Sequence, residues 1–239
     1  MKDDDLIELS ESRELAQRKT SAIESLSAMA DEIADSDESS SHTANRRGLV
    51  LGGDDPRDAA LEEHPVAENT MYQGLIFNVS RLDVQLSDGQ MAARDVVRHP
   101  GAVAIVALSD DGRICLVRQY RASLGRVTVE IPAGKLDPGE DPLDCARREL
   151  EEETGFSSEK IAFLTSFITS VGFSDEVIYL YMATGIKQGE AHPDEDEFIN
   201  VDLVDLDEVI NAVLDGRIED VKTIVGALAC DAISRRLSP

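Results

Sequence analysis

Hydrophobic and polar positions change their period along the chain, and this change predicts where the folded core begins. From Met71, short apolar runs predict strands over Met71–Val79, Ser80–Leu86 and Met91–Val97. The residues Ser-Asp-Gly-Gln at 87–90 are typical of a hairpin turn between two such strands. We therefore expect an antiparallel strand region before the main sheet.

The next run, GAVAIVAL at Gly101–Leu108, is nearly continuous and predicts a strand buried on both faces. The turn Ser109–Gly112 then reverses the chain into a strand over Arg113–Tyr120. Because strands and helices follow without regular βαβ alternation, we expect a mixed sheet with helices on both faces, an α/β fold. The remaining predicted strands are Val127–Ile131, Ile161–Ile168, Val177–Thr184 and Glu197–Asp205, and the later helices are Leu206–Leu214 and Asp220–Leu237.

One helix is indicated at both of its ends. Asp141 suits the N-cap, Pro142 suits the first helical position, and Gly155 suits a left-handed C-cap. At 100° per residue one narrow stripe of the helix is expected to pack on a sheet. This stripe consists of Leu143, Ala146, Leu150 and Thr154.

Beside the stripe, Glu149 and Glu153 form an i, i+4 pair, and Glu152 lies one step further round. Exposed like charges at this spacing repel by a few tenths of a kcal/mol unless a cation lies between them. Hard oxygen ligands suit Mg²⁺, or Mn²⁺. The competing interpretation is a solvated acidic helix face, which is common in a chain with 48 Asp and Glu residues.

The spacing of the whole segment favours the metal site. Gly134–Phe156 fits G-x5-E-x7-R-E-U-x-E-E-x-G-U at every position, where U is a bulky apolar residue, and a chance match is on the order of one in 10^5. The segment resembles the Nudix box, and the chain is similar to Nudix hydrolases. The resemblance implies an α/β/α sandwich that hydrolyses a nucleoside diphosphate linked to another moiety. The matched positions are Gly134, Glu140, Arg148, Glu149, Leu150, Glu152, Glu153, Gly155 and Phe156.

Residues 1–66 differ in composition from the predicted hydrolase domain at 67–239. They contain 17 acidic and seven basic residues and no aromatic residue, which is typical of an extension with a linker. Within them, Glu11–Ala34 has helix-compatible apolar spacing. It is either a docking or dimer-contact helix or a marginal helix that frays alone. In the hydrolase domain, residues 67–98 are expected to serve dimerisation and residues 99–239 to form the catalytic core.

Composition excludes several classes of protein. A net charge of −25 argues against nucleic acid as a partner. No apolar run approaches the roughly 18 residues of a membrane span, and the acidic N-terminus is unlike a signal peptide, so we expect no membrane partner. Three isolated cysteines without metal-ligand spacing argue against zinc and disulfides and favour a reducing cytoplasm.

Several stretches, most of them outside the box, resemble the ADP-ribose pyrophosphatase branch of the family. This resemblance implies that Mg²⁺-dependent hydrolysis converts ADP-ribose, a small nucleoside diphosphate substrate, to AMP and ribose 5-phosphate. A GDP-mannose-like nucleotide sugar is the alternative substrate, and a non-catalytic ligand sensor is the alternative class of protein. The matching stretches are HPGAVAIVAL at 99–108, VRQYR at 117–121, VEIPAGKLDPGE at 129–140, GFSDE at 172–176, DEDEF at 194–198 and DGRIEDVKT at 215–223.

The same resemblance implies roles for metal and water. Glu149 and Glu153 are the expected main metal ligands together with the Ala133 carbonyl, and Glu152 is a further ligand or orients the water. In DEDEF, Glu195 and Glu197 are candidates for the general base or for additional ligands.

Further roles concern the substrate and the frame of the box. Arg121 is expected to hold a phosphate or terminal ribose oxygen, because a guanidinium fork suits that contact, and Glu130 is a second substrate-binding candidate. Phe77 and Arg94 match positions that clamp adenine across a dimer interface. Structural roles are expected for Arg148, which would pair with Glu140, and for Gly134 and Gly155.

Two features bear on specificity and assembly. Val171 occupies a position where ADP-ribose enzymes usually carry proline. Leu75, Ile76 and Phe77 are consecutive apolar residues, more than one sheet face can cover, so a homodimer is expected.

Overall fold

The computed structural model describes residues 28, 55, 57–193 and 197–237. The chain forms two compact units. The larger unit includes residues 101–167 and 178–237, and the smaller includes the described residues from Asp55 to Pro100 together with Ile168–Val177. The predicted helix at Glu11–Ala34 and the residue Glu195 lie outside the described residues, apart from the single position 28.

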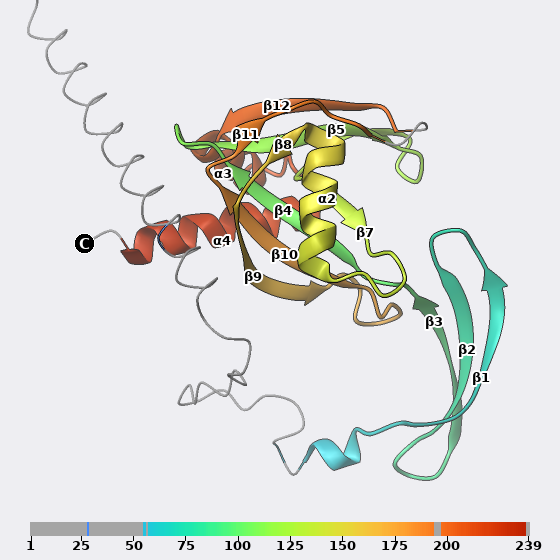
Figure 1. Ribbon diagram of the computed structural model, residues 1–239. Coiled ribbons are helices and arrows are strands. Elements are labelled where there is room, and N and C mark those ends of the chain that lie inside the picture. The colour runs from blue at the N-terminus through green and yellow to red at the C-terminus, as the bar shows by residue number, and fades with distance from the viewer. Residues whose placement is uncertain (1–27, 29–54, 56, 194–196, 238–239) are drawn as a thin grey trace, which may run out of the picture. The chain divides into compact units, whose positions relative to one another are not determined.

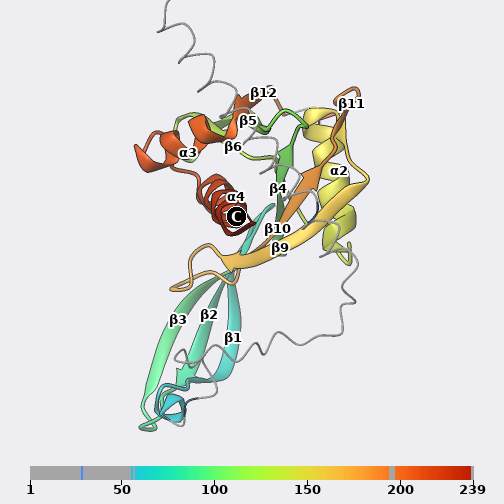
Figure 2. The same ribbon diagram turned by 90° about the vertical axis from the view of Figure 1, so that its left-hand side faces the viewer.

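The larger unit is an α/β/α sandwich around a mixed sheet, as the sequence predicts (Figures 1 and 2). Strand β4 pairs in parallel with β10 and antiparallel with β5, and β5 pairs antiparallel with β12. Figure 2 shows α2 on one face of this sheet and α3 and α4 on the other. The strands are β4 (Ala102–Leu108), β5 (Arg113–Arg121), β6 (Arg126–Glu130), β7 (Ala133–Lys135), β8 (Phe156–Ser157), β9 (Lys160–Ile168), β10 (Val177–Thr184), β11 (Lys187–Gln188) and β12 (Ile199–Asp205), and the helices are α2 (Pro142–Thr154), α3 (Leu206–Leu214) and α4 (Val221–Leu237).

Two hydrophobic clusters fill the spaces on either side of the sheet. Side chains of β4 alternate between them, which is why the continuous apolar run of this strand is buried on both faces. Val103 and Ile105 pack with Leu150 of α2, while Ala104 and Val106 pack on the side of α3 and α4. The position of α2 is therefore set by apolar packing against β4.

The smaller unit contains an antiparallel sheet in the order β1-β2-β3. The prediction of one strand over Met71–Val79 is wrong, because β1 ends at Gln73 and Gly74 N donates to Phe77 O at 3.0 Å, which closes a tight turn. The apolar residues of this turn suggested a continuing strand, but the chain reverses there. The bounds are η1 (Asp58–Ala60), β1 (His64–Gln73), β2 (Asn78–Gln85) and β3 (Met91–Arg98).

The element bounds also refine the expected domain limits. Strand β1 begins at His64, so the predicted limit between residues 66 and 67 falls inside a strand. The loop Ile168–Val177 groups with the smaller unit, because Val97 N donates to Phe173 O at 2.7 Å and Asp175 N donates to Val97 O at 3.2 Å.

Among the described helices, none is long and apolar enough to cross a membrane.

Candidate active site

Helix α2 begins and ends where the sequence predicts. The Asp141 side chain accepts a hydrogen bond from Leu143 N at 2.9 Å, and Gly155 ends the helix with φ 73°. Cys145, Ala146 and Leu150 are fully buried against the sheet, which sets the rotation of the helix. This rotation places the three glutamates along the edge of the buried face.

Glu153 is the most buried of these glutamates, with 5% of the residue exposed. Its Oε2 accepts a hydrogen bond from Ala133 N of β7 at 3.0 Å. Burial raises the pKa of Glu153 to about 8, and the negative charges of Glu149 and Glu197 act in the same direction. A carboxylate at this position is therefore costly unless positive charge compensates it.

Glu149 lies directly against the backbone of β7. A methyl group on the Cα of Gly134 would overlap the Glu149 carboxylate, so only glycine allows this approach. Burial raises the pKa of Glu149, and the positive charge of Arg148 opposes this effect. The Nudix-box glycine thus makes room for a predicted metal ligand.

Arg148 pairs with three glutamates of the segment through one guanidinium group. The expected ion pair with Glu140 is present, with Nε to Oε1 at 2.9 Å and Nη2 to Oε2 at 3.0 Å. The same side chain donates from Nη1 to Glu149 at 2.7 Å and to Glu152 at 2.9 Å. The hydrogen bonds that Arg148 donates to Glu140 are the largest cause that lowers the pKa of Glu140, to about 2.

The predicted metal ligands do not converge on one point. Among the described residues, no three His, Cys, Asp or Glu side chains are grouped closely enough to hold a metal ion. Glu149 and Glu152 instead accept hydrogen bonds from Arg148, and Glu153 accepts one from Ala133 N. The predicted role of the Ala133 carbonyl as a metal ligand stays a prediction. The donor chemistry still fits Mg²⁺ or Mn²⁺, because three carboxylates lie within about one helical turn and the charge of Glu149 acts against ionisation of the buried Glu153.

Arg121 and Glu130 are brought together on β5 and β6. Glu130 is 4% exposed and accepts from Arg121 Nε and Nη2, both at 2.8 Å. Lys222 Nζ of α4 donates to the same carboxylate at 2.8 Å. No sequence pattern predicts a role for Lys222, and the only signal for it is its place in the stretch DGRIEDVKT.

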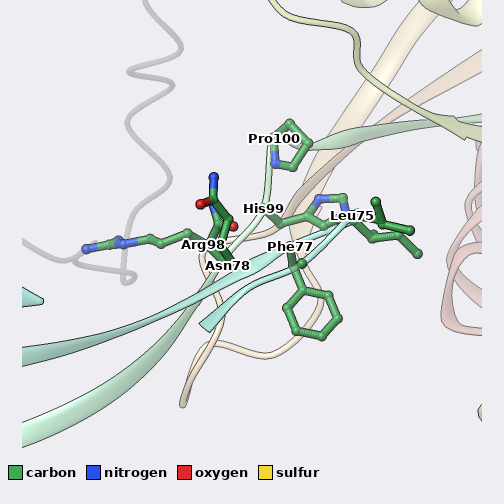
Figure 3. A pocket seen from close by; sticks show the side chains of 9 residues that line it. Leu75, Phe77, Asn78, Arg98, His99 and Pro100 are labelled. Atoms are coloured by element: carbon green, nitrogen blue, oxygen red, sulfur yellow. The ribbon is translucent and has the colours of Figure 1, made fainter. Parts of the chain in front are cut away.

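The predicted adenine clamp is not assembled within the smaller unit. Phe77 lines a pocket of about 380 Å³ with the β1–β2 turn and Arg98 to Pro100 (Figure 3). Arg94 instead pairs with Glu63. In the β2–β3 register, Asn78, which follows Phe77, lies opposite Arg98. Arg94 lies opposite Leu82, four residues further along β2, and is therefore further from Phe77.

The other predicted residues are distributed as follows. Glu197 is partly buried, and its charge raises the pKa of both Glu149 and Glu153, so it lies within electrostatic reach of α2. Val171 is 84% exposed in the loop between β9 and β10.

A three-layer α/β/α fold carries a glutamate-rich helix that lies against Gly134 of β7 and is held by Arg148, and this arrangement indicates a hydrolase. Residues 98–224 match the NUDIX domain family, which covers more than half of the chain. The protein belongs to this family and is a Nudix hydrolase.

Relatives extend over most of the chain. It is 45% identical over 167 residues to the methanol dehydrogenase activator of Bacillus methanolicus, covering 69% of this chain and 90% of that protein. It is 41% identical over 166 residues to the ADP-ribose pyrophosphatase of Bacillus subtilis (strain 168), with the same coverage. A solved structure of an ADP compounds hydrolase has the same fold, with a TM-score of 0.66, 19% identity, and coverage of 74% of this chain and 96% of that one.

Proposed function

We propose that the protein hydrolyses the diphosphate bond of ADP-ribose. Water adds to one phosphorus, the P–O–P bond breaks, and AMP and ribose 5-phosphate leave. The observation that carries the proposal is the complete glutamate set of α2, held by Gly134 and Arg148, in a chain 41% identical to a protein named ADP-ribose pyrophosphatase.

Glu149, Glu152 and Glu153, with the carbonyl of Ala133, are the groups that would hold Mg²⁺ (or Mn²⁺). A bound divalent ion of this kind neutralises phosphate charge and lowers the pKa of water. Arg148 contributes differently, because its ion pairs compensate the charges of Glu140, Glu149 and Glu152 and orient these side chains.

Glu197 of DEDEF is the candidate for the general base among the described residues, and it lies within electrostatic reach of Glu149 and Glu153. Arg121 would donate a hydrogen bond to a phosphate or ribose oxygen from Nη1, because Nε and Nη2 already donate to Glu130. These groups position substrate and water.

We further propose a homodimer whose contact involves the smaller unit. Met71, Tyr72, Leu75 and Ile76 are all more than half exposed, and a second copy would cover them. Phe77 and Arg94 would then serve adenine from two different subunits. The three cysteines are buried and free, which supports a reducing cytoplasm as the location.

A substrate panel assayed with Mg²⁺ tests the activity. We expect the highest kcat/KM for ADP-ribose against GDP-mannose and a dinucleoside polyphosphate, and loss of turnover with EDTA. A tenfold preference for GDP-mannose would show that the substrate is another nucleotide sugar and not ADP-ribose. Absence of turnover with every substrate would favour the ligand sensor.

A further inference from the structure

The Glu130 carboxylate is buried yet receives four hydrogen bonds from side chains. Its Oε1 accepts from Arg121 Nε at 2.8 Å and from Thr128 Oγ1 at 2.6 Å. Its Oε2 accepts from Arg121 Nη2 and from Lys222 Nζ, each at 2.8 Å. Burial, the largest influence, raises the pKa of Glu130, but the bonds and charges of Arg121 and Lys222 together outweigh it and leave the pKa lowered.

Lys222 is itself fixed from the side of α4. Its Nζ donates to Asp220 Oδ1 at 2.7 Å, and its side chain is only 13% exposed. Asp220 Oδ2 accepts from Thr223 N at 2.9 Å and from Thr223 Oγ1 at 2.7 Å. The Thr223 hydroxyl in turn accepts from Ile131 N at 2.8 Å, so the start of α4 is tied to the backbone that follows β6.

Arg121 differs from Lys222 because it is accessible. Its side chain is 38% exposed, and it uses only the Nε and Nη2 edge on Glu130. Among the hydrogen bonds of the described residues, none involves Arg121 Nη1. Its partner Glu130 lies three residues before Ala133, whose N–H donates to Glu153 Oε2 at 3.0 Å, so one short backbone segment connects the Arg121–Glu130 pair to α2.

We propose that Lys222 is a positioning residue for Arg121: by sharing Glu130, it holds the carboxylate in place and leaves the outer edge of the guanidinium for a substrate oxyanion. The proposal rests on the function proposed above. Arg121 and Lys222 balance the charges of Glu130 and Asp220. Without Lys222 the cluster carries one excess negative charge, and Arg121 becomes the sole cationic partner of Glu130. The excess negative charge would repel a phosphate oxygen of the substrate and weaken its binding to Arg121.

Steady-state kinetics of Lys222→Met tests this role. We expect KM for ADP-ribose to rise about tenfold with kcat within about twofold of wild type, because the interaction is made with both the ground state and the transition state. Lys222→Arg, which keeps the charge, should recover most of the loss in KM. Lys187→Met is the matched control, since Lys187 forms an exposed ion pair with Glu159 at 3.0 Å, and its KM should equal that of wild type.

A double variant shows whether Lys222 acts through Glu130. In a Glu130→Gln background, the additional Lys222→Met change should alter KM less than about twofold, because the shared carboxylate charge is already gone. Full additivity of the two effects on KM would overturn the proposal. A Lys222→Met protein with a lowered Tm and an unchanged KM would also overturn it, because Lys222 would then serve stability alone.

A readout without turnover separates this inference from the proposed function. The ¹⁵N NMR signal of Arg121 Nε reports the hydrogen bond to Glu130 and needs no substrate. We expect this signal to move in Lys222→Met and to stay in place in Lys187→Met. If wild type hydrolyses nothing but the signal moves, the proposed function fails and the coupling of Lys222 to Arg121 stands; an unmoved signal overturns the coupling whatever the activity.

Discussion

Glu153 combines burial with a position among other carboxylates, and this combination has an energetic cost. Its backbone hydrogen bond comes from Ala133 N, while Glu149 and Glu197 repel its charge. Residues that are unfavourable for stability at such a position are typical of functional sites.

The change Glu153→Gln separates function from stability at this position. It keeps the shape but removes a negative ligand, so kcat should fall by about 10^2-fold or more, which corresponds to roughly 3 kcal/mol of barrier. Thermal unfolding should show a Tm equal to or above that of wild type, because a buried charge has been removed. Retention of more than half of the activity at saturating Mg²⁺ would show that the metal site is assigned wrongly.

Gly134 is the second residue at which chemistry depends on close contact. Gly134→Ala should displace the Glu149 carboxylate, since the new methyl group overlaps it, and we expect a loss of activity of about tenfold or more. The overlap involves the end of a flexible side chain, so Tm should change little.

The matched measurement uses Glu149→Gln. If Gly134→Ala acts through Glu149, adding it to Glu149→Gln should reduce kcat/KM only slightly further. A large further loss would indicate that Gly134 matters for the backbone of β7 instead.

At the scale of elements, α4 and the sheet approach each other closely at Gly226. A Cβ at this residue would lie 2.7 Å from Val106 Cγ2 and 3.3 Å from Ile131 Cδ1. Alanine is favoured over glycine in a helix by about 1 kcal/mol, but overpacking a core costs about 1–3 kcal/mol. Because Val106 is fully buried and branched at Cβ, its methyl group cannot turn away freely.

We therefore expect Gly226→Ala to lower the free energy of unfolding by about 1 kcal/mol in urea titrations. In a Val106→Ala background, Gly226→Ala should instead raise the free energy of unfolding, because the added methyl group fills the space that the valine leaves. Stabilisation by Gly226→Ala in the wild-type background would mean that helix propensity outweighs the close contact.

At the scale of the whole molecule, the acidic extension and the smaller unit make separate predictions. A protein starting at Val66 would cut into β1, so the informative truncation begins at Asp55, ahead of η1. Ser87 Oγ donates to Ala60 O at 2.8 Å and connects η1 to the β2–β3 turn, which favours keeping η1. We expect this shortened protein to sediment as a dimer and to retain wild-type kcat/KM.

Two outcomes would contradict this expectation in different ways. An active monomer would rule out an adenine site shared between subunits. A folded but inactive dimer would show that residues 1–54 contribute to the site. Tyr72→Asp and Leu75→Asp, which place charge on exposed apolar positions, should weaken the dimer in the same sedimentation assay.

The sequence by itself determined the elements whose signals are local. The bounds of α2 follow from Asp141, Pro142 and Gly155, and those of β4 follow from an uninterrupted apolar run. The order of the glutamates in α2 and their match to the Nudix box depend only on spacing along one helix, so the family could be recognised without coordinates.

Tertiary structure decided what depends on partners distant in the chain. Glu130 meets Lys222 across 92 positions, and no local pattern predicts that pairing. The tight turn at Gly74–Phe77 overrode an apolar run that predicted a strand, and β7 is three residues long, too short for any period to reveal. Likewise the spacing of the glutamates did not predict that Arg148 would bind two of them, because the direction of a side chain is set by its neighbours in the fold.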